Sequence, residues 1–377
     1  MKRVIVSGGG TGGHIYPAVA VAEALRRRFG EEVEILFVGA EGKMEMEKVP
    51  ALGYRIVGLP VAGLQRRFDL KNLAVPFKVL KSIRKARRTI RDFGADVVVG
   101  FGGYASGPVL WAAQRMGIPT VIQEQNSYAG VTNKLLAQKA DKICVAYEGM
   151  ERFFPKEKII LTGNPVRQDL LTCSKSREEI LKGFGLDPNR KTILIIGGSL
   201  GARTVNESVQ SQLPLIKDSD VQIIWQTGGY YFDSIQKTLA QQGKPQNLFV
   251  TDFITHMDEA YAAADLVISR AGASSISELC LLGKASILVP SPNVAEDHQT
   301  KNAMALVRKD AALFVKDSEA VNSLIPLALK TCQDAALLQK LSENSKKMSF
   351  KDSANVIAEQ VYQLAIKYRD KKQKHGN

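Results

Sequence analysis

A glycine-rich segment followed by one histidine is the part of this sequence best suited to chemistry beside a phosphate. Residues 8–13 hold five glycines after a short apolar run, and His14 comes directly after them. Glycines between a strand and a helix let backbone N–H groups approach a phosphate, and the helix start adds a favourable partial positive charge. An imidazole titrates near neutral pH, so His14 is a candidate general base.

The same glycines leave a second interpretation open. Gly8, Gly10 and Gly13 satisfy G-x-G-x-x-G, and Glu41 follows the next apolar run as a possible ribose acceptor. This arrangement is typical of nicotinamide or flavin dehydrogenases. Dinucleotide-binding folds use that helix start for the pyrophosphate and need no histidine there, so His14 favours a different enzyme. The dehydrogenase stays as an alternative, and so does a tight turn without a ligand.

The second half of the chain contains a candidate nucleotide site. Residues 197–199, Gly-Gly-Ser, follow an apolar run, so their amides and the Ser199 hydroxyl could hold a diphosphate. Residues 273–277 offer further amides and hydroxyls at the start of a helix, and Glu278 could accept both ribose hydroxyls. The alternative is that Glu278 only complements the helix dipole, which is worth about 0.3–1 kcal/mol. Residues 297–299, Asp-His-Gln, are less specific and could form a capping turn.

Three further polar clusters follow expected strands, where open α/β sheets bind their ligands. They are residues 102–108, which include Tyr104 and Ser106, residues 124–126, and residues 164–167. Side-chain amides and hydroxyls in such loops often form hydrogen bonds with the loop backbone, and an arginine near a domain boundary often forms an ion pair between domains. Each of these residues can therefore have a structural role instead of a ligand-binding one.

No metal site is expected. Asp218-Ser219-Asp220 has a D-x-D pattern, but it precedes an expected strand, which is the wrong end for a ligand site. The four cysteines include no Cys-x-x-Cys pair, so zinc thiolate sites are improbable.

Short apolar runs alternate with helical patterns along the chain of 377 residues, which indicates α/β units with parallel sheets. The length favours two domains. The turn at residues 163–165 suggests a boundary there, so we expect an N-terminal domain over 1–165, a C-terminal domain over 166–350, and a final helix with a basic tail over 351–377, the helix possibly returning to the first domain. The expected strands are 3–7, 33–38, 97–101, 120–123, 142–146 and 159–162, then 192–196, 222–226, 248–251, 266–269 and 285–289. Because each half opens with a strand and a glycine-rich loop, the pattern suggests two Rossmann-like domains facing across a cleft.

The net charge of +13 is concentrated in two segments. Residues 66–91 hold ten basic side chains against one acidic, and residues 367–377 hold five against one, which together equal the whole net charge. A protein that coats a polyanion would spread its charge more widely, and only Phe68 and Phe77 lie among the basic residues of the first segment, so nucleic acid is disfavoured. The amino-terminal apolar run is too short for a signal peptide, and glycines interrupt the uncharged stretch 97–114, so we expect a cytoplasmic protein without a membrane span.

The basic segment over 64–91 is a candidate membrane-docking surface. Pro76 suits the first turn of a helix, and Val79, Ile83, Ala86 and Ile90 recur at helical spacing with basic residues between them. Apolar groups in the preceding loop could enter the headgroup region of an anionic bilayer. Alternatively, the apolar stripe packs on the sheet of the first domain and the charges form a solvated face; both can hold together.

Six motifs in order along the chain resemble one family. They are residues 9–14, GGTGGH; 102–108, GGYASGP; 124–126, EQN; 163–167, GNPVR; 197–202, GGSLGA; and 297–299, DHQ. Together, over residues 4 to about 300, they are similar to the MurG family of cell-wall N-acetylglucosaminyltransferases. Other lipid glycosyltransferases are the nearest competitors and differ in acceptor.

The resemblance implies a GT-B fold and transfer of GlcNAc from UDP-GlcNAc to the MurNAc 4-hydroxyl of lipid I, undecaprenyl-diphosphate-MurNAc-pentapeptide, with inversion to give lipid II. It implies a peripheral protein on the cytoplasmic face of the plasma membrane. His14 would be the base, Tyr104 and Ser106 acceptor-side candidates, and no metal or other cofactor would be obligatory. The expected donor-binding residues are Thr11, Gly12, Gly13, Asn126, Arg167, Ser199, Ile254 through its backbone, Ala273, Ser274, Ser275, Ile276, Ser277, Glu278 and Gln299.

Overall fold

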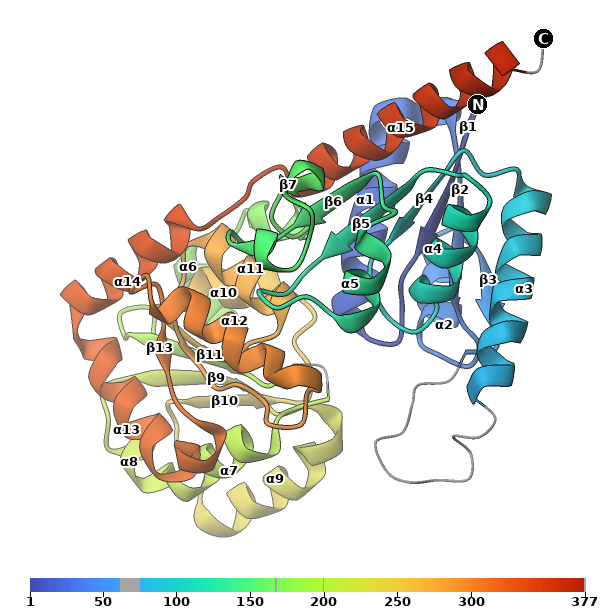
Figure 1. The fold of residues 1–377 in the computed structure, drawn as a ribbon. Helices are drawn as coiled ribbons and strands as arrows, with labels where there is room; N and C mark the ends of the chain where they lie inside the picture. The colour runs from blue at the N-terminus through green and yellow to red at the C-terminus, as the bar shows by residue number, and fades with distance from the viewer. Residues whose placement is uncertain (62–74, 167, 199, 376–377) are drawn as a thin grey trace. The chain divides into compact units, whose positions relative to one another are not determined.

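The computed structural model describes residues 1–61, 75–166, 168–198 and 200–375, and the chain divides into two compact units (Figure 1). Unit 1 comprises residues 1–166 and 350–377, and unit 2 comprises residues 167–349. The carboxyl-terminal segment therefore returns to the amino-terminal unit. Among the described residues, no helix is both long enough and apolar enough to cross a membrane.

Unit 1 is built on a parallel sheet whose order, in the described part of the chain, is β3-β2-β1-β4-β5-β6-β7. The strands are β1 (Lys2–Ser7), β2 (Val33–Ala40), β3 (Arg55–Leu59), β4 (Val97–Gly100), β5 (Thr120–Glu124), β6 (Lys142–Val145) and β7 (Ile159–Leu161). The helices are α1 (Gly12–Phe29), α2 (Glu45–Ala51), α3 (Val75–Phe93), α4 (Ser106–Arg115), α5 (Val131–Ala137) and α15 (Ser353–His375).

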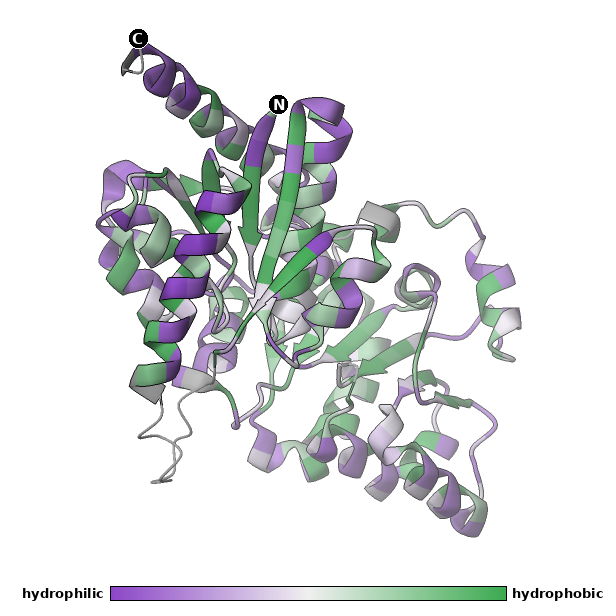
Figure 2. Ribbon diagram, turned by 90° about the vertical axis from the view of Figure 1, so that its right-hand side faces the viewer, coloured by the Kyte–Doolittle hydropathy of each residue, from purple (hydrophilic) through white to green (hydrophobic). Residues whose placement is uncertain are grey.

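Alternate residues of these strands enter two cores on opposite faces of the sheet, as the two-residue period of a strand requires. Val4 and Val6 of β1 pack in a core with α1 and α15, whereas Ile5 packs in the opposite core with α3, α4 and α5. Both faces are covered, so the middle parts of the central strands are mostly apolar, and Figure 2 shows them largely in green with hydrophilic residues toward some strand ends.

Helix α15 is held against α1 by apolar and polar contacts. The Phe29 and Tyr362 rings stack with centroids 3.7 Å apart, and Ile357 and Val361 are buried in the same core. Arg28 forms an ion pair with Glu359 at 2.8 Å. Removing this helix would therefore expose apolar residues of α1, β1 and β4 on one face of the unit 1 sheet.

Unit 2 repeats the arrangement with the strand order β10-β9-β8-β11-β12-β13 among its described residues. The strands are β8 (Thr192–Ile196), β9 (Gln222–Gln226), β10 (Leu248–Thr251), β11 (Leu266–Ser269), β12 (Ala285–Leu288) and β13 (Leu313–Phe314). The helices are α6 (Arg177–Gly183), α7 (Arg203–Ser211), α8 (Leu213–Lys217), α9 (Gly229–Gln242), α10 (Met257–Ala263), α11 (Ala273–Leu282), α12 (His298–Val307), α13 (Ala320–Gln333) and α14 (Ala335–Lys347). Trp225 is fully buried in its core, where the indole N–H donates to Asn206 Oδ1 at 3.0 Å.

All eleven expected strands are present with ends that differ by two residues at most. Two strands were not expected: β3 and β13. They are the outermost strands at one edge of each sheet, and β13 is only two residues long. Edge strands need less continuous apolar sequence than central ones, so the pattern on which the prediction rests is weak there.

Candidate active site

In unit 1, the loops that follow β1 and β4 meet where the strand order reverses. These strands are neighbours, but the helices that follow them cover opposite faces of the sheet, and in open α/β sheets the ligand crevice lies at the carboxyl ends of such a strand pair. The two loops touch through backbone: a Cβ added at Gly103, which has a φ of +81°, would lie 2.2 Å from Gly9 O. Only glycine allows this approach.

His14 lies in the first turn of α1, at this meeting point. Its Nδ1 is 3.0 Å from Gly9 O and 3.2 Å from Thr11 Oγ1. Because a carbonyl oxygen can only accept, the contact with Gly9 requires a proton on Nδ1, and Nε2 then carries the lone pair of the neutral ring. A Cβ built at Gly102 would lie 3.0 Å from Nε2. The Nε2 lone pair of this tautomer therefore lies on the side of the β4 loop.

Buried amides connect the ends of three strands around this crevice. Gln123 Nε2 donates to Asn164 Oδ1 at 2.9 Å, and Asn164 Nδ2 donates to Gln125 O at 3.0 Å. Gln125 Nε2 in turn donates to Phe101 O at 2.7 Å. Gln125 and Asn164, from two of the predicted motifs, therefore position the loops and are themselves buried.

Glu124 positions the predicted donor-binding residue Asn126. Its buried carboxylate accepts from the N–H and Nδ2 of Asn126, from Gly130 N–H at 3.0 Å and from Asn133 Nδ2 at 2.8 Å. Burial raises the pKa of Glu124, and these hydrogen bonds oppose the rise. The Glu124 carboxylate therefore holds the loop after β5 in place through hydrogen bonds to three of its neighbours. This role was not predicted from the sequence, although Glu124 belongs to the Glu-Gln-Asn motif.

The two acceptor-side candidates differ in exposure. The Tyr104 side chain is 55% exposed on the loop after β4. Ser106, the first residue of α4, is 1% exposed, and its hydroxyl has no hydrogen-bond partner among the residues that the structure describes. Tyr104 is therefore available to a ligand in the present conformation, whereas Ser106 lies beneath the surface.

Helix α3 carries the described part of the predicted docking segment; residues 64–74 lie outside the described residues. Ala86 and Ile90 are each 1% exposed and belong to the core with α4. Val79 is 40% exposed and Ile83 is half-buried, so only the carboxyl-terminal half of the predicted stripe packs on the unit. The earlier turns leave Phe77 and Leu80 on the surface, at 76% and 52%.

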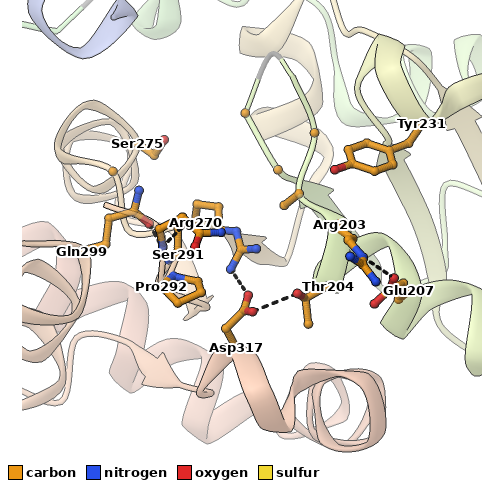
Figure 3. A pocket seen from close by; sticks show the side chains of 16 residues that line it. Arg203, Thr204, Glu207, Tyr231, Arg270, Ser275, Ser291, Pro292, Gln299 and Asp317 are labelled. Carbon is orange, nitrogen blue, oxygen red and sulfur yellow. Dashed lines mark hydrogen bonds and ion pairs between the residues drawn. The ribbon is translucent and has the colours of Figure 1, made fainter. Parts of the chain in front are cut away.

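Unit 2 has a polar cavity of about 660 Å³ at the carboxyl ends of β8 and β11, again where the strand order reverses (Figure 3). The loop after β8 runs close to the backbone of Thr227 here: a Cβ at Gly201, which has a φ of +80°, would lie 2.0 Å from Thr227 O, so the position requires glycine. The lining residues are Gly197, Gly198, Gly201, Ala202, Arg203, Thr204, Glu207, Tyr231, Arg270, Gly272, Ser275, Ser291, Pro292, Asn293, Gln299 and Asp317.

Ser275 and Gln299 are the two predicted donor-binding residues in this lining. Ser275 lies in the first turn of α11, where backbone N–H groups that lack a partner within the helix can bind an anion. Gln299 Oε1 accepts the Ser291 N–H at 2.9 Å and so links the start of α12 to the loop after β12. Ser199 and Arg167 lie outside the described residues.

The other predicted residues of α11 have varied environments. Ile276 is buried, Ser277 Oγ donates to Ala273 O at 2.9 Å, and the buried Ser274 hydroxyl has no hydrogen-bond partner within the described part of the chain. Glu278, one turn further along the helix, is half-buried and accepts from Tyr261 OH at 3.0 Å.

Ile254, predicted to bind uracil through its backbone, follows β10. Its N–H donates to Gln226 Oε1 at 3.0 Å, and Gln226 Nε2 donates to Gly198 O at 3.1 Å. Gln226 therefore connects this loop to the glycine loop. A base that used the Ile254 N–H would have to replace the Gln226 oxygen.

Arg270, Asp317 and Thr204, none of them among the predicted site residues, form a polar network in the lining of the cavity. Arg270 forms an ion pair with Asp317 and donates to Val289 O at 3.1 Å. Asp317 also accepts from Thr204 Oγ1 at 2.9 Å (Figure 3). Arg270 could have been chosen from the sequence, because it directly follows the expected strand 266–269. Thr204 lies two residues after the motif at 197–202 and could have been considered with it, whereas Asp317 is far from any recognised motif.

Among the described residues, no group of three or more His, Cys, Asp or Glu side chains could hold a metal ion. Asp220 lies at the amino end of β9, and its side chain is 98% exposed.

Comparison with known proteins places these features in one family. Residues 4–145 match the glycosyltransferase family 28 N-terminal domain, and residues 192–357 match the C-terminal domain of the same family. The chain is 62% identical over 367 residues to the UDP-N-acetylglucosamine–N-acetylmuramyl-(pentapeptide) pyrophosphoryl-undecaprenol N-acetylglucosamine transferase of Phocaeicola vulgatus, covering 97% of each chain. It is 59% identical to the protein of the same name from Parabacteroides distasonis, covering 97% of this chain and 99% of that one.

Comparison with solved structures agrees with the sequence matches. The crystal structure of Acinetobacter baumannii MurG has a TM-score of 0.76 at 29% identity and covers 96% of this chain and 100% of that one. The kitacinnamycin glycosyltransferase shares the fold, with a TM-score of 0.70 at 14% identity over 96% of this chain and 99% of that one. The predicted GT-B fold and glycosyltransferase activity are confirmed, and the dehydrogenase alternative is wrong. This chain belongs to glycosyltransferase family 28, among its MurG-type N-acetylglucosaminyltransferases.

Proposed function

We propose that the chain transfers GlcNAc from UDP-GlcNAc to the MurNAc 4-hydroxyl of lipid I and forms lipid II with inversion at the anomeric carbon. The observation that carries this proposal is the 62% identity, over 97% of both chains, to a relative whose name states this donor sugar and this acceptor. The unit 2 cavity supports it, since glycine amides and two helix starts line a space large enough for a nucleotide.

In this proposal, unit 2 binds the donor. Backbone N–H groups at the starts of α7 and α11 stabilise the diphosphate, and Glu278 binds the ribose hydroxyls. Ile254, Gln299, Ser199 and Arg167 are the other donor-binding residues predicted in unit 2, and Thr11, Gly12, Gly13 and Asn126 are those predicted in unit 1. Because these N–H groups are already oriented, they stabilise the negative charge that grows on the departing UDP without reorganising.

His14 supplies the base in unit 1. The acceptor oxygen attacks the anomeric carbon of GlcNAc from the face opposite UDP, the bond from that carbon to the diphosphate oxygen breaks, and UDP leaves with the electron pair. The hydroxyl proton passes to His14 Nε2. The Nδ1 contact with Gly9 O at 3.0 Å supports this role, because it places the lone pair on Nε2. Tyr104, exposed on the adjoining loop, and Ser106 are proposed on the acceptor side.

The reaction in this proposal requires no metal or other cofactor. Helix starts and backbone N–H groups take the place of a cation on the leaving diphosphate. Asp218 and Asp220 are at the amino end of β9, so they are at the wrong edge of the sheet to bind that diphosphate. Transfer should therefore continue at an unchanged rate in excess EDTA.

We further propose that the protein attaches peripherally to the cytoplasmic face of the plasma membrane through residues 64–91, and that nucleic acid is not a partner. The exposed basic and apolar side chains of α3 support attachment. The concentration of net charge in two short segments is unlike a nucleic-acid surface.

The test is an assay of labelled UDP-GlcNAc and UDP-glucose with lipid I and with diacylglycerol in parallel. We expect transfer of GlcNAc to lipid I alone, and a β-linked sugar in the product from the α-linked donor by NMR. The His14→Ala variant serves as the inactive control. Transfer to diacylglycerol, or a product that keeps the donor configuration, would contradict the proposal.

A further inference from the structure

Glu45, the first residue of α2, is a carboxylate buried completely inside unit 1. Its exposed fraction is 0%, Oε2 accepts the Gly10 N–H at 2.9 Å, and Oε1 accepts the Ala40 N–H at 2.9 Å. Among the described residues, no cationic side chain forms an ion pair with it. A charge buried without a counter-ion is costly unless it is hydrogen-bonded, so these two backbone groups stabilise it.

The surroundings of Glu45 are shaped to fit this side chain. A Cβ at Gly9 would lie 2.1 Å from Oε1, and a Cβ at Gly39 would lie 2.6 Å from Cγ. Side chains at either position would displace the carboxylate. The glycine loop after β1 and the end of β2 are therefore both built around Glu45.

The Gly9–Gly10 peptide group joins Glu45 to His14. Its N–H donates to Glu45 Oε2 at 2.9 Å, and its carbonyl oxygen is 3.0 Å from His14 Nδ1. A peptide whose N–H donates to a carboxylate is polarised, which makes its carbonyl a stronger acceptor. The arrangement is the peptide-mediated counterpart of a carboxylate that contacts an imidazole directly and fixes its tautomer.

We propose that Glu45 is a positioning residue that acts through the Gly9–Gly10 peptide to hold His14 with its proton on Nδ1 and its lone pair on Nε2. The inference rests on the proposed function in that a fixed Nε2 lone pair is useful to a general base. The competing explanation is that Glu45 only closes the turn between β2 and α2 through Ala40. That explanation predicts a loss of stability without any effect on the imidazole.

The test combines the Glu45→Gln variant with nitrogen NMR of ¹⁵N-histidine-labelled protein. The chain has four histidines, so the His14 signals are assigned by their loss in His14→Ala. We expect neutral His14 of the wild type to carry its proton on Nδ1. A glutamine amide has only one oxygen, so it can accept from only one of the two backbone N–H groups, and its own N–H group faces the other. The Gly9–Gly10 peptide is then held less firmly, and the Glu45→Gln variant should show a mixture of the two neutral tautomers of His14. Its kcat should fall about 10- to 100-fold, while KM for UDP-GlcNAc changes by less than about twofold.

Two further variants complete the test. Glu45→Asp keeps the negative charge on a shorter side chain. It should shift the His14 tautomer signals in the same direction as Glu45→Gln but by a smaller amount. It also provides the measurement if the Glu45→Gln variant does not fold. Glu41→Gln is the matched control, because that carboxylate, in the same connection between β2 and α2, is exposed and paired with Lys85 at 2.8 Å. It should match the wild type in spectrum and kcat.

The outcomes separate this inference from the proposed function. A wild-type His14 that carries its proton on Nε2, or Glu45 variants with wild-type His14 signals and kcat, would overturn the role of Glu45. Full turnover by His14→Ala would instead overturn the base assignment, and it would leave the tautomer measurement to decide the role of Glu45.

Discussion

The basic face of α3 gives a prediction that separates electrostatic from apolar membrane attachment. Ala86 and Ile90 fix which side of the helix faces the core. Lys85 and Arg88 form ion pairs with Glu41 at 2.8 Å and with Asp92 at 3.3 Å, so replacing them would also disturb local contacts. The exposed basic side chains outside those pairs make the cleaner perturbation. Four of them, Lys78, Lys81, Arg84 and Arg87, are to be changed together to Gln.

The expected loss follows from the charge removed. Each basic side chain near an anionic surface is worth about 1 kcal/mol, so four replacements should weaken binding to anionic vesicles by about 4 kcal/mol, or about a thousandfold. Changing Phe77 and Leu80 to Ser removes an apolar contribution of about 1.5–3 kcal/mol for each side chain that enters the bilayer. The first loss should disappear in 1 M salt, where the Debye length falls to about 3 Å, and the second should persist.

Co-sedimentation with vesicles that contain anionic lipid measures both effects, with UDP affinity as the check on folding. The matched control changes Lys367, Lys371, Lys372 and Lys374, four exposed lysines of α15, to Gln and removes the same charge. We expect the α3 variant to be released at low salt and the α15 variant to bind nearly as well as the wild type. Equal binding by the α3 variant and the wild type, or equal losses in the two variants, would refute a docking site on α3.

Three further predictions concern the site and the stability of unit 2. His14→Ala should lower kcat by about 10²–10⁴-fold with UDP affinity nearly unchanged, as measured by turnover and calorimetry; a loss of UDP binding instead would make His14 a donor-binding residue. Glu278→Gln should weaken UDP binding by about 10- to 150-fold, since one hydrogen bond to a charged group is worth about 1.5–3 kcal/mol. Tyr261→Phe, which removes only the partner of that carboxylate, is its control, and a wild type that binds UDP and 2′-deoxy-UDP equally would argue against ribose recognition. Asp265→Asn should lower the free energy of unfolding of unit 2 by at least about 1.5–3 kcal/mol at neutral pH. Although burial raises the pKa of Asp265, hydrogen bonds from Thr192 and Lys191 hold it below the ordinary value of 3.8. Its contribution is therefore present above that value and is lost as the pH falls through the lower folded pKa, so denaturation curves of the two proteins should converge in acid; a difference that is constant with pH would refute this.

The sequence predicts the central sheet well because burial on both faces leaves a continuous apolar run. Val97–Gly100 and Thr192–Ile196 are of this kind, and both strands were expected from their composition. Arg55–Leu59 contains an arginine and a glycine, and its pairing with Leu36 to Ala40 is what makes it a strand. Such a strand depends on a neighbour distant in the sequence, so local patterning does not indicate it.

The α3 stripe shows the same limit in a helix. Periodicity correctly indicates that Val79, Ile83, Ala86 and Ile90 share one side of the helix. It cannot tell where along the helix the neighbouring elements end. Packing against α4 and β3 covers Ala86 and Ile90, whereas Val79 is 40% exposed. One helix therefore fits both interpretations: its carboxyl-terminal turns pack in the core, and its amino-terminal turns leave apolar side chains exposed.

The least predictable site residues are those that act through backbone. A glycine loop followed by a histidine can be recognised in the sequence, because few structures need those residue types at that spacing. Glu45 is 35 positions from Gly10 in the sequence and is the first residue of the short helix α2. Glutamate is usually a surface residue, so nothing in the sequence indicates that this one is buried. Only the fold brings its carboxylate beneath the glycine loop. Gly9 therefore has two reasons to lack a side chain, the phosphate for which the sequence suggested the loop and the Glu45 carboxylate beneath it, whereas Gly39 has the second reason alone. Sequence reasoning recognised only the first reason.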